Sequence, residues 1–452
     1  MTNVAPKTNA APKTNVAPKT RTTRSASTVE SRSSSIDLSR RDLTLDIARV
    51  FCVLLVVAIH LMMVGVGFDA DERLVAQSPS ESPLGTQPWF AGVTWAGQIM
   101  PLFFVVGGFA SITAWRSTVR RGGTPAGYVR NRVLRLAQPA LPLYIFYAVV
   151  IGAATIAAIA PELLSLAVQG AASPLWFLAA YTLCQSMVPT MVGLHARAPR
   201  LTLASLLIGA VIVDSLRLAT GIDEIGLANL FFVWLFAQQL GFWYADGWFD
   251  ARRWWHLVLI AAASYAALLP LTFSGSYPFN MLTNLNPPTV PLIALAVAQA
   301  CVLRLLRPAL ALLMNTHAAR AVVFIVGSRL MTVYLWHLPI ILIITGASLL
   351  IPGAAPMPGS AAWWWSRPVL YIVVLLAVFA LSFVVGRWEA PREITATPPG
   401  GIVALAAVLS FIPSLLVLEF FMNLTLAVVG SMLLAVSVLM LGRWRTHATA
   451  LD

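Results

Sequence analysis

The sequence predicts an all-α integral membrane protein, a helical bundle that crosses the bilayer many times. Of the 452 residues, 58% are hydrophobic and only 11% are charged, whereas about a quarter of the residues of a typical soluble domain are charged. Apolar stretches with the length that a helix needs to cross about 30 Å of hydrocarbon recur from Leu43 onward. Basic and acidic residues occupy alternate connecting segments. Most of this chain therefore needs lipid as its solvent.

Ten apolar stretches form a predicted core, and a longer apolar run follows them. The predicted core spans cover residues 44–66, 90–114, 137–160, 174–192, 201–219, 226–245, 254–273, 289–306, 330–351 and 368–387. The run from Gly401 to Leu441 is too long for one crossing, so we expect two further spans that turn near Glu419 to Asn423. The prediction is a ten-span core with two extra C-terminal spans.

Composition divides the chain into three regions. Residues 1–40 repeat the hexapeptides TNVAPK and TNAAPK and then become rich in Ser, Thr and Arg. A segment this polar cannot bury enough apolar area to order itself, so we expect a disordered cytoplasmic tail. Residues 41–390 are expected to form the membrane core. Residues 391–452 are expected to form an additional transmembrane hairpin and a cytoplasmic C-terminus.

The distribution of arginine predicts the orientation. Segments after the even-numbered spans, together with the N-terminal tail, hold most of the arginines, and the opposite segments hold mainly Asp and Glu. Because basic residues are enriched in cytoplasmic loops, we expect a multi-pass protein of the plasma membrane with both termini in the cytoplasm. The net charge of +12 is then explained by topology and anionic membrane lipids, and no nucleic-acid partner is expected.

The cysteines indicate neither a metal site nor a disulfide framework. Cys52, Cys184 and Cys301 lie in separate apolar stretches, without metal-like spacing. We expect them to be small buried side chains, with no metal and no permanently bound cofactor.

Three ionisable residues lie in the first span, where such side chains are costly and often functional. At 100° per residue, Arg49 and His60 differ by only about 20° around the helix, and Asp46 and His60 by about 40°, so all three share one stripe. A structural interpretation is an ion pair between Asp46 and Arg49, with His60 hydrogen bonding to another helix. A catalytic interpretation is that the His60 imidazole accepts a proton from a hydroxyl.

Five motifs in order resemble the bacterial membrane-bound acyltransferases of family three, the O-antigen acetyltransferase type. The family's opening signature has an Asp, an Arg three residues later, and a His after ten intervening residues, which Asp46, Arg49 and His60 match. In the second span Gly107 replaces the family's usual Ser. The other similar segments are PLFFVVGGFA at 101–110, YVRNRVLRLAQP at 128–139, LWFLAAY at 175–181 and VYLWHLP at 333–339.

The resemblance implies an O-acyltransferase whose co-substrate is an acyl-CoA bound from the cytoplasm, with acetyl as the expected acyl group. The acceptor would be a hydroxyl of a glycan, a lipid-linked molecule or a secondary metabolite. His60 and Asp46 are the expected catalytic residues. The guanidinium groups expected to hold the donor phosphates are those of Arg49, Arg130, Arg132 and Arg135.

The loop arginines have an alternative explanation, which is topology and lipid contact alone. Four further residues are candidates to line the site: Trp176, Tyr181, Tyr334 and His337. For Trp176 and Tyr181 the default interpretation is an aromatic belt at the membrane interface. For His337 the default interpretation is a structural hydrogen bond or a position in the aromatic belt.

A secondary transporter or exporter of a small organic anion would also have twelve spans and intramembrane charges. It would predict internal symmetry between two halves of the chain, and the repeat in this sequence is confined to the tail. A membrane sensor or scaffold would need no convergent polar stripe. We therefore expect an acyltransferase.

Overall fold

The computed structural model describes residues 42–77, 81–158, 161–386 and 398–442. Twelve helices in this part are long and apolar enough to cross a membrane. The chain is thus a multi-pass, all-α membrane protein, as predicted. The predicted tail, and the predicted boundary between residues 390 and 391, lie outside the described residues.

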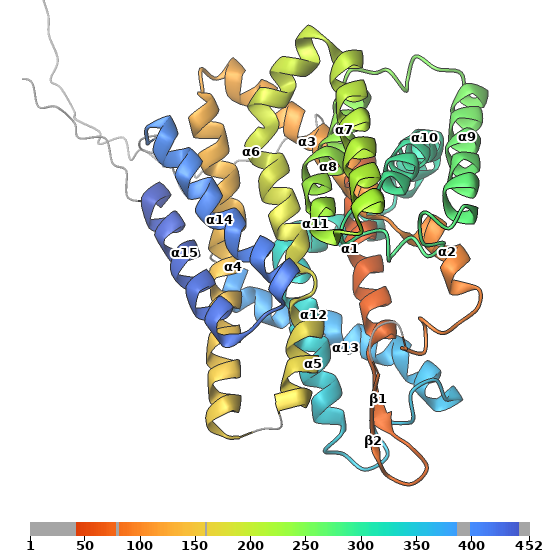
Figure 1. Cartoon of the computed structure of the whole chain (residues 1–452), viewed down its shortest axis with the longest axis vertical. Helices are drawn as coiled ribbons and strands as arrows, with labels where there is room; N and C mark the ends of the chain where they lie inside the picture. Colours follow the sequence, from red (N-terminus) through yellow and green to blue (C-terminus); the bar gives the residue numbers. More distant parts are fainter. Residues whose placement is uncertain (1–41, 78–80, 159–160, 387–397, 443–452) are drawn as a thin grey trace, which may run out of the picture. The chain divides into compact units, whose positions relative to one another are not determined.

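The long helices follow the predicted spans (Figure 1). They are α1 Leu43–Met63, α3 Met100–Arg120, α4 Pro125–Ile156, α6 Leu175–Arg197, α7 Pro199–Thr220, α8 Asn229–Ala245, α9 Trp254–Phe273, α10 Val290–Leu313, α12 Leu330–Ser348, α13 Ala361–Val385, α14 Gly400–Phe420 and α15 Leu424–Gly442. The shorter elements are α2 Phe90–Gly97, α5 Pro161–Ala172, α11 His317–Gly327, the 3-10 helix η2 Asp223–Ala228, and the antiparallel strands β1 Gly65–Phe68 and β2 Leu74–Gln77. The predicted C-terminal pair is confirmed, because α14 and α15 turn at residues 421–423.

Two predicted spans differ most from the structure in their bounds. The span predicted at 137–160 begins twelve residues earlier, since Thr124 caps α4 by accepting a hydrogen bond from the Gly127 backbone N–H at 3.1 Å. The arginine segment predicted to precede this span is therefore part of its helix. The span predicted at 90–114 is interrupted between α2 and α3. There the side-chain oxygen of Gln98 accepts from the Met100 N–H at 3.3 Å, and Pro101 lies in the first turn of α3.

Close backbone packing joins α3 to α8 in the interior. A Cβ atom on Gly108 would lie 2.2 Å from the carbonyl oxygen of Gln238, and one on Gly241 would lie 2.1 Å from that of Val105. Only glycine permits such an approach, and small residues at helix interfaces are typical of membrane bundles. The Gln238 side chain also donates to the Cys184 carbonyl of α6 at 3.0 Å, which holds a third helix in place.

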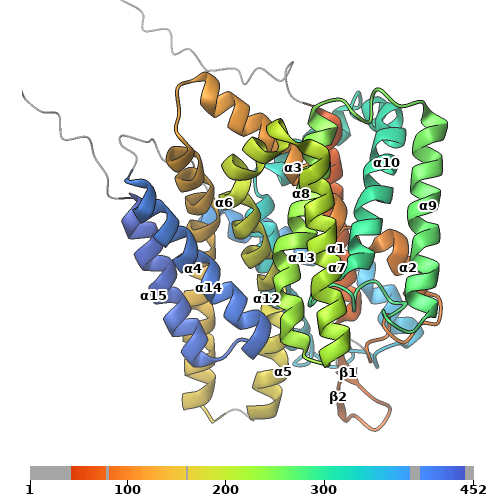
Figure 2. The ribbon, with the colours of Figure 1, turned by 45° about the horizontal axis from the view of Figure 1, so that its top comes forward.

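The C-terminal helices α14 and α15 pack against α4 and α6 (Figures 1 and 2). Arg130 on α4 donates from Nε to the Leu441 carbonyl at 2.8 Å, and the Tyr144 hydroxyl lies 3.1 Å from Ser414 Oγ. These contacts attach the hairpin to the core near both ends of α14 and α15.

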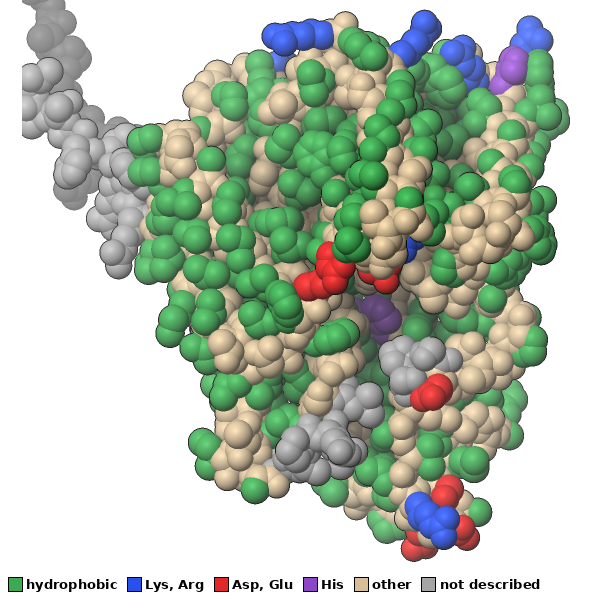
Figure 3. All heavy atoms as spheres, viewed as in Figure 1, with side chains coloured by type: hydrophobic (Ala, Val, Ile, Leu, Met, Phe, Trp, Pro, Cys, Tyr) green, Lys and Arg blue, Asp and Glu red, His purple; other side chains and the backbone are tan. Residues whose placement is uncertain are grey.

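The bundle has two chemically different ends. The end where α1 and α4 begin and α3 ends is here named the arginine-rich end. On the face drawn in Figure 3, blue side chains gather at this end. The opposite end, where α1 ends and the two strands pair, is named the hairpin end, and there Arg73 pairs with Asp71 at 3.5 Å.

Candidate active site

His60 on α1 and His337 on α12 form a pair between the two helices. Nδ1 of His60 lies 2.7 Å from Nε2 of His337. The two rings are nearly parallel, with an interplanar angle of 8° and centroids 5.0 Å apart. His337 is fully buried and His60 is half-buried. The structure therefore brings a candidate lining residue into direct contact with the candidate base.

A backbone carbonyl determines which nitrogen of each neutral imidazole carries the proton. Nδ1 of His337 lies 2.7 Å from the carbonyl oxygen of Tyr334. Because a carbonyl only accepts, Nδ1 must donate, and the Nε2 of neutral His337 is then an acceptor. His60 consequently donates from Nδ1 and keeps the lone pair of its own Nε2 free. This is the tautomer that a general base needs.

The two helices that carry the histidine pair share a cluster of buried apolar side chains with α13. The buried members of this cluster are Val53, Val57, Leu61, Val333, Leu338, Ile341, Val374 and Val378. Leu61 and Leu338 of this cluster directly follow the two histidines in the chain. A hydrogen bond in such an interior is electrostatically stronger than one in water.

A cavity of about 190 Å³ towards the arginine-rich end, here named the arginine pocket, collects three of the predicted donor residues. Its lining includes Arg49, Arg132, Arg135, Tyr181, Ser111 and Gln185, with Phe103, Ala110, Leu136, Gly327, Ser328, Leu330 and Met331. The guanidinium carbon of Arg132 lies 5.0 Å from the centre of the Tyr128 ring. Within the described part of the chain, Arg49 makes no hydrogen bond or ion pair.

The charged side chains that line the arginine pocket are all positive. Three guanidinium groups reach it, and no Asp or Glu is among the described residues that line it. Planar guanidinium groups bind phosphate through paired hydrogen bonds, so the pocket suits an anionic, phosphate-bearing ligand.

A second cavity of about 510 Å³ lies towards the hairpin end and is here named the hairpin-end cavity. Its lining comes from α1, the two strands, α5, α12 and the turn before α15: Met63, Val64, Gly65, Val66, Leu74, Ala76, Gln77, Ala167, Gln169, Gly170, Ser173, Leu342, Thr345, Gly346, Leu349 and Phe421. Met63 lies three residues beyond His60, whereas Arg49 lies eleven residues before it. Along α1, the histidine pair is therefore between the two cavities.

Comparison with known proteins identifies the family. A family model described as an acyltransferase domain matches residues 42–387. The chain belongs to the membrane-bound acyltransferases of family three. No curated protein and no solved structure matches the chain. The matched region of this acyltransferase ends before α14, so the C-terminal hairpin lies outside it. The assignment makes the chain an enzyme and favours acyl transfer over the transporter alternative.

Six of the ten predicted site residues of the acyltransferase are not among those that line either cavity: the two histidines of the pair, and Arg130, Trp176, Tyr334 and Asp46. Arg130 is buried and binds the Leu441 carbonyl of α15 instead. Trp176 is buried too and stacks on Trp234 with centroids 5.6 Å apart. The Tyr334 hydroxyl donates to the Pro174 carbonyl at 2.8 Å. Asp46 lies one turn before Arg49 on α1 and is half-buried.

The Tyr181 ring of the acyltransferase lies against Gly107. A Cβ atom on Gly107 would lie 3.2 Å from a ring carbon of Tyr181, which is tighter than an ordinary contact. Ser111, one turn further along α3, is one of the hydroxyl-bearing residues that line the arginine pocket. Ser111 Oγ donates to the Gly107 carbonyl at 2.6 Å and accepts from Gln185 Nε2 at 2.9 Å. Ser111 and Gln185 were not predicted as site residues. Ser111 lies four residues after Gly107, and Gln185 lies four residues after Tyr181, so helical spacing alone could have indicated both.

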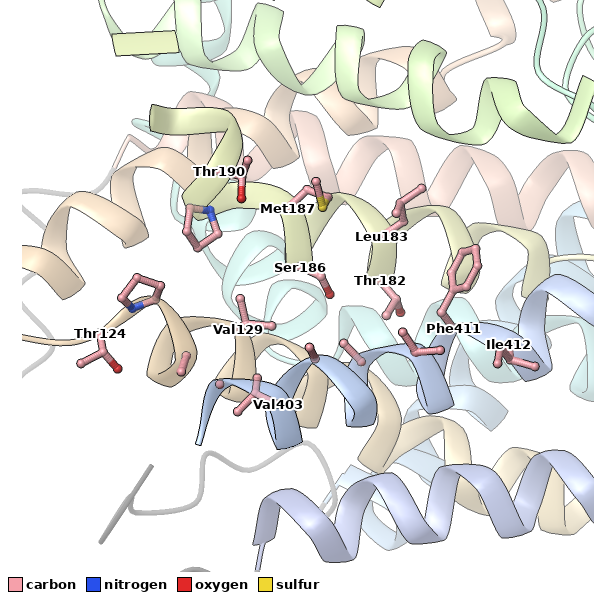
Figure 4. Close-up of a pocket in the computed structure, with 17 residues that line it drawn as sticks. Thr124, Val129, Thr182, Leu183, Ser186, Met187, Thr190, Val403, Phe411 and Ile412 are labelled. Carbon is pink, nitrogen blue, oxygen red and sulfur yellow. The ribbon is translucent and has the colours of Figure 1, made fainter. Parts of the chain in front are cut away.

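A groove of about 840 Å³ lies between α4, α6 and the hairpin of the acyltransferase (Figure 4). Thr182, Ser186 and Thr190 line it from one face of α6, and Val403 and Phe411 line it from α14. None of the predicted site residues is among those that line it. We therefore assign no step of the reaction to this groove.

Proposed function

We propose that this enzyme transfers an acetyl group from acetyl-CoA, held at the arginine pocket, to a hydroxyl of an acceptor, with His60 as general base. The observation that carries the proposal is the position and tautomer of the histidine pair. A base with a free Nε2 lies in an apolar site, with an anion-binding pocket on one side and a second cavity on the other.

The donor phosphates are assigned to the guanidinium groups of Arg49, Arg132 and Arg135. Ligand pockets for whole drug-sized molecules usually measure about 300–1,000 Å³, so the arginine pocket suits a diphosphate rather than the complete donor. Arg49 and His60 are separated by about 16 Å along α1. The long, flexible arm of coenzyme A, which joins its diphosphate to its sulfur, is the part of the donor that would cover this distance.

The chemical step is a direct transfer. The acceptor oxygen attacks the thioester carbonyl carbon while His60 Nε2 takes the hydroxyl proton. The tetrahedral intermediate then collapses, the carbon–sulfur bond breaks, and the departing sulfur receives the proton from His60. The products are the acetyl ester and free coenzyme A.

His337 is a positioning residue in this mechanism. Its Nε2 accepts the His60 Nδ1–H, which keeps the free lone pair on the reacting nitrogen of His60. The same hydrogen bond stabilises the imidazolium that forms when His60 is protonated.

The side of the membrane from which acyl-CoA is supplied determines the proposed orientation of the protein. We place the arginine-rich end in the cytoplasm, where acyl-CoA is made and where basic residues are enriched, and we place the protein in the plasma membrane. The hairpin end then faces the opposite side, and the acceptor reaches His60 from there.

Release of free coenzyme A tests the proposal. The full chain, purified and reconstituted into nanodiscs, is incubated with acetyl-CoA and a membrane extract, and free thiol is measured over time. Wild-type protein should release coenzyme A far faster than the His60→Ala variant. Equal release by the two proteins would contradict the proposed function. Uptake of a small anion into proteoliposomes without thiol release would favour a transporter.

A further inference from the structure

We infer that the hairpin-end cavity is the acceptor site, and that the acceptor is a lipophilic alcohol, a hydrocarbon chain that carries the reacting hydroxyl. This inference rests on the proposed function, because it takes His60 as the base.

The position of the cavity follows from the two helices that carry the histidines. Met63 lies three residues after His60 on α1, and Thr345 lies eight residues after His337 on α12. At these spacings each residue shares the helix face of its histidine. Both residues line the cavity. The faces that bring the two imidazoles together therefore continue into its wall, about 4.5 Å further along the axis of α1.

The lining gives the chemical class of the occupant. No Arg, Lys, His, Asp or Glu is among the described residues of this wall. Its polar side chains are limited to those of Gln77, Gln169, Ser173 and Thr345. A free sugar would need many more partners for its hydroxyl groups, and burial of polar groups without partners is costly.

The remaining wall suits a hydrocarbon chain. It is made of aliphatic and aromatic groups, including those of Val66, Leu74, Leu342, Leu349 and Phe421. Its volume of about 510 Å³ lies in the usual range for ligand cavities. Each methylene that is buried there should strengthen binding about fourfold.

Two glycines of the wall allow a sharp test. A Cβ atom on Gly346 or on Gly170 would meet no atom within 4 Å, so a leucine side chain at either position starts in open space at the wall of the cavity. Gly193 on α6 is a matched control. It has the same open surroundings and is not among the residues that line the arginine pocket or the hairpin-end cavity.

The experiment uses the purified full chain in nanodiscs, acetyl-CoA, primary alcohols from butanol to decanol, and glucose as the polar comparison. The KM of the alcohols should fall about fourfold for each added methylene until the cavity is filled. Gly346→Leu should raise the KM of decanol about tenfold or more and leave the KM of acetyl-CoA unchanged. Gly193→Leu should leave both values unchanged.

Several results would overturn the inference. Acetylation of glucose in preference to every alcohol would exclude a lipophilic acceptor. An unchanged KM of decanol in both Gly346→Leu and Gly170→Leu would show that the alcohol binds elsewhere. An effect of Gly346→Leu only on longer acyl-CoA donors would assign the cavity to the donor chain. Release of coenzyme A that depends on His60, without any alcohol ester, would leave the proposed function standing and this inference wrong.

Discussion

The imidazoles of His60 and His337 meet at 2.7 Å, although 277 residues separate them in the chain. The carbonyl of Tyr334 orients His337, and His337 orients His60. The base is therefore the end of a chain of hydrogen bonds that begins at the backbone of α12. This relationship leads to separate expectations for the two histidines.

His60→Ala should lower turnover by about 10²–10⁴-fold, the usual contribution of a general base. Binding of acetyl-CoA should be retained, because the donor phosphates lie at the arginine pocket. Membrane insertion should also be retained, since the substitution makes α1 more apolar. Turnover, the donor dissociation constant and the yield of inserted protein would be measured together. Turnover above about a tenth of the wild-type value would show that His60 is structural.

His337→Leu should lower turnover at least about tenfold, because the His60 Nδ1–H loses its acceptor and the tautomer is no longer held. His337→Gln should lose less, since the glutamine carbonyl oxygen can accept the same hydrogen bond. The KM of the donor should not change in either variant. Steady-state kinetics of the two variants separate this positioning role from a packing role. A packing role would make leucine the better replacement.

Arg49→Ala should raise the KM of acetyl-CoA about 10–100-fold, which corresponds to the loss of one charged hydrogen bond worth about 1.5–3 kcal/mol. Arg49→Lys should recover part of this loss, because the ammonium keeps the charge and lacks the paired geometry. Arg130→Ala is the matched control. Its side chain binds the Leu441 carbonyl outside the pocket, so the melting temperature should fall while the donor KM stays constant. A donor KM that responds equally to both alanine variants would contradict the assignment.

Gly430→Leu should destabilise the protein by about 1–3 kcal/mol, the usual cost of overpacking. A Cβ atom at this position of α15 would lie 2.5 Å from the Tyr144 ring of α4, so the hairpin would have to shift. The KM of the donor should remain unchanged, because the hairpin does not line the arginine pocket. Thermal unfolding in detergent would be compared with that of Gly193→Leu, which has open space at its Cβ position. Equal melting temperatures would show that α15 can move without cost.

The sequence by itself determined the number of spans and the polar stripe of α1. Both depend on local properties: the length of an apolar run sets whether a helix can cross the bilayer, and helical periodicity sets which residues share a face. The length of the apolar segment 401–441 was enough to divide it correctly into two spans. Helical periodicity was enough to place Arg49 and His60 on one stripe of α1.

Only the tertiary structure decided which partners these residues meet. Helical periodicity puts Arg130 and Arg132 about 200° apart on α4. Only the packing of the helices shows that Arg130 meets α15 and that Arg132 meets the arginine pocket. His337 contacts His60 because α12 packs against α1 at a particular rotation. Such a rotation depends on how side chains of distant helices interdigitate, and hydrophobic periodicity carries little of this information in a membrane, where lipid and neighbouring helices are both apolar.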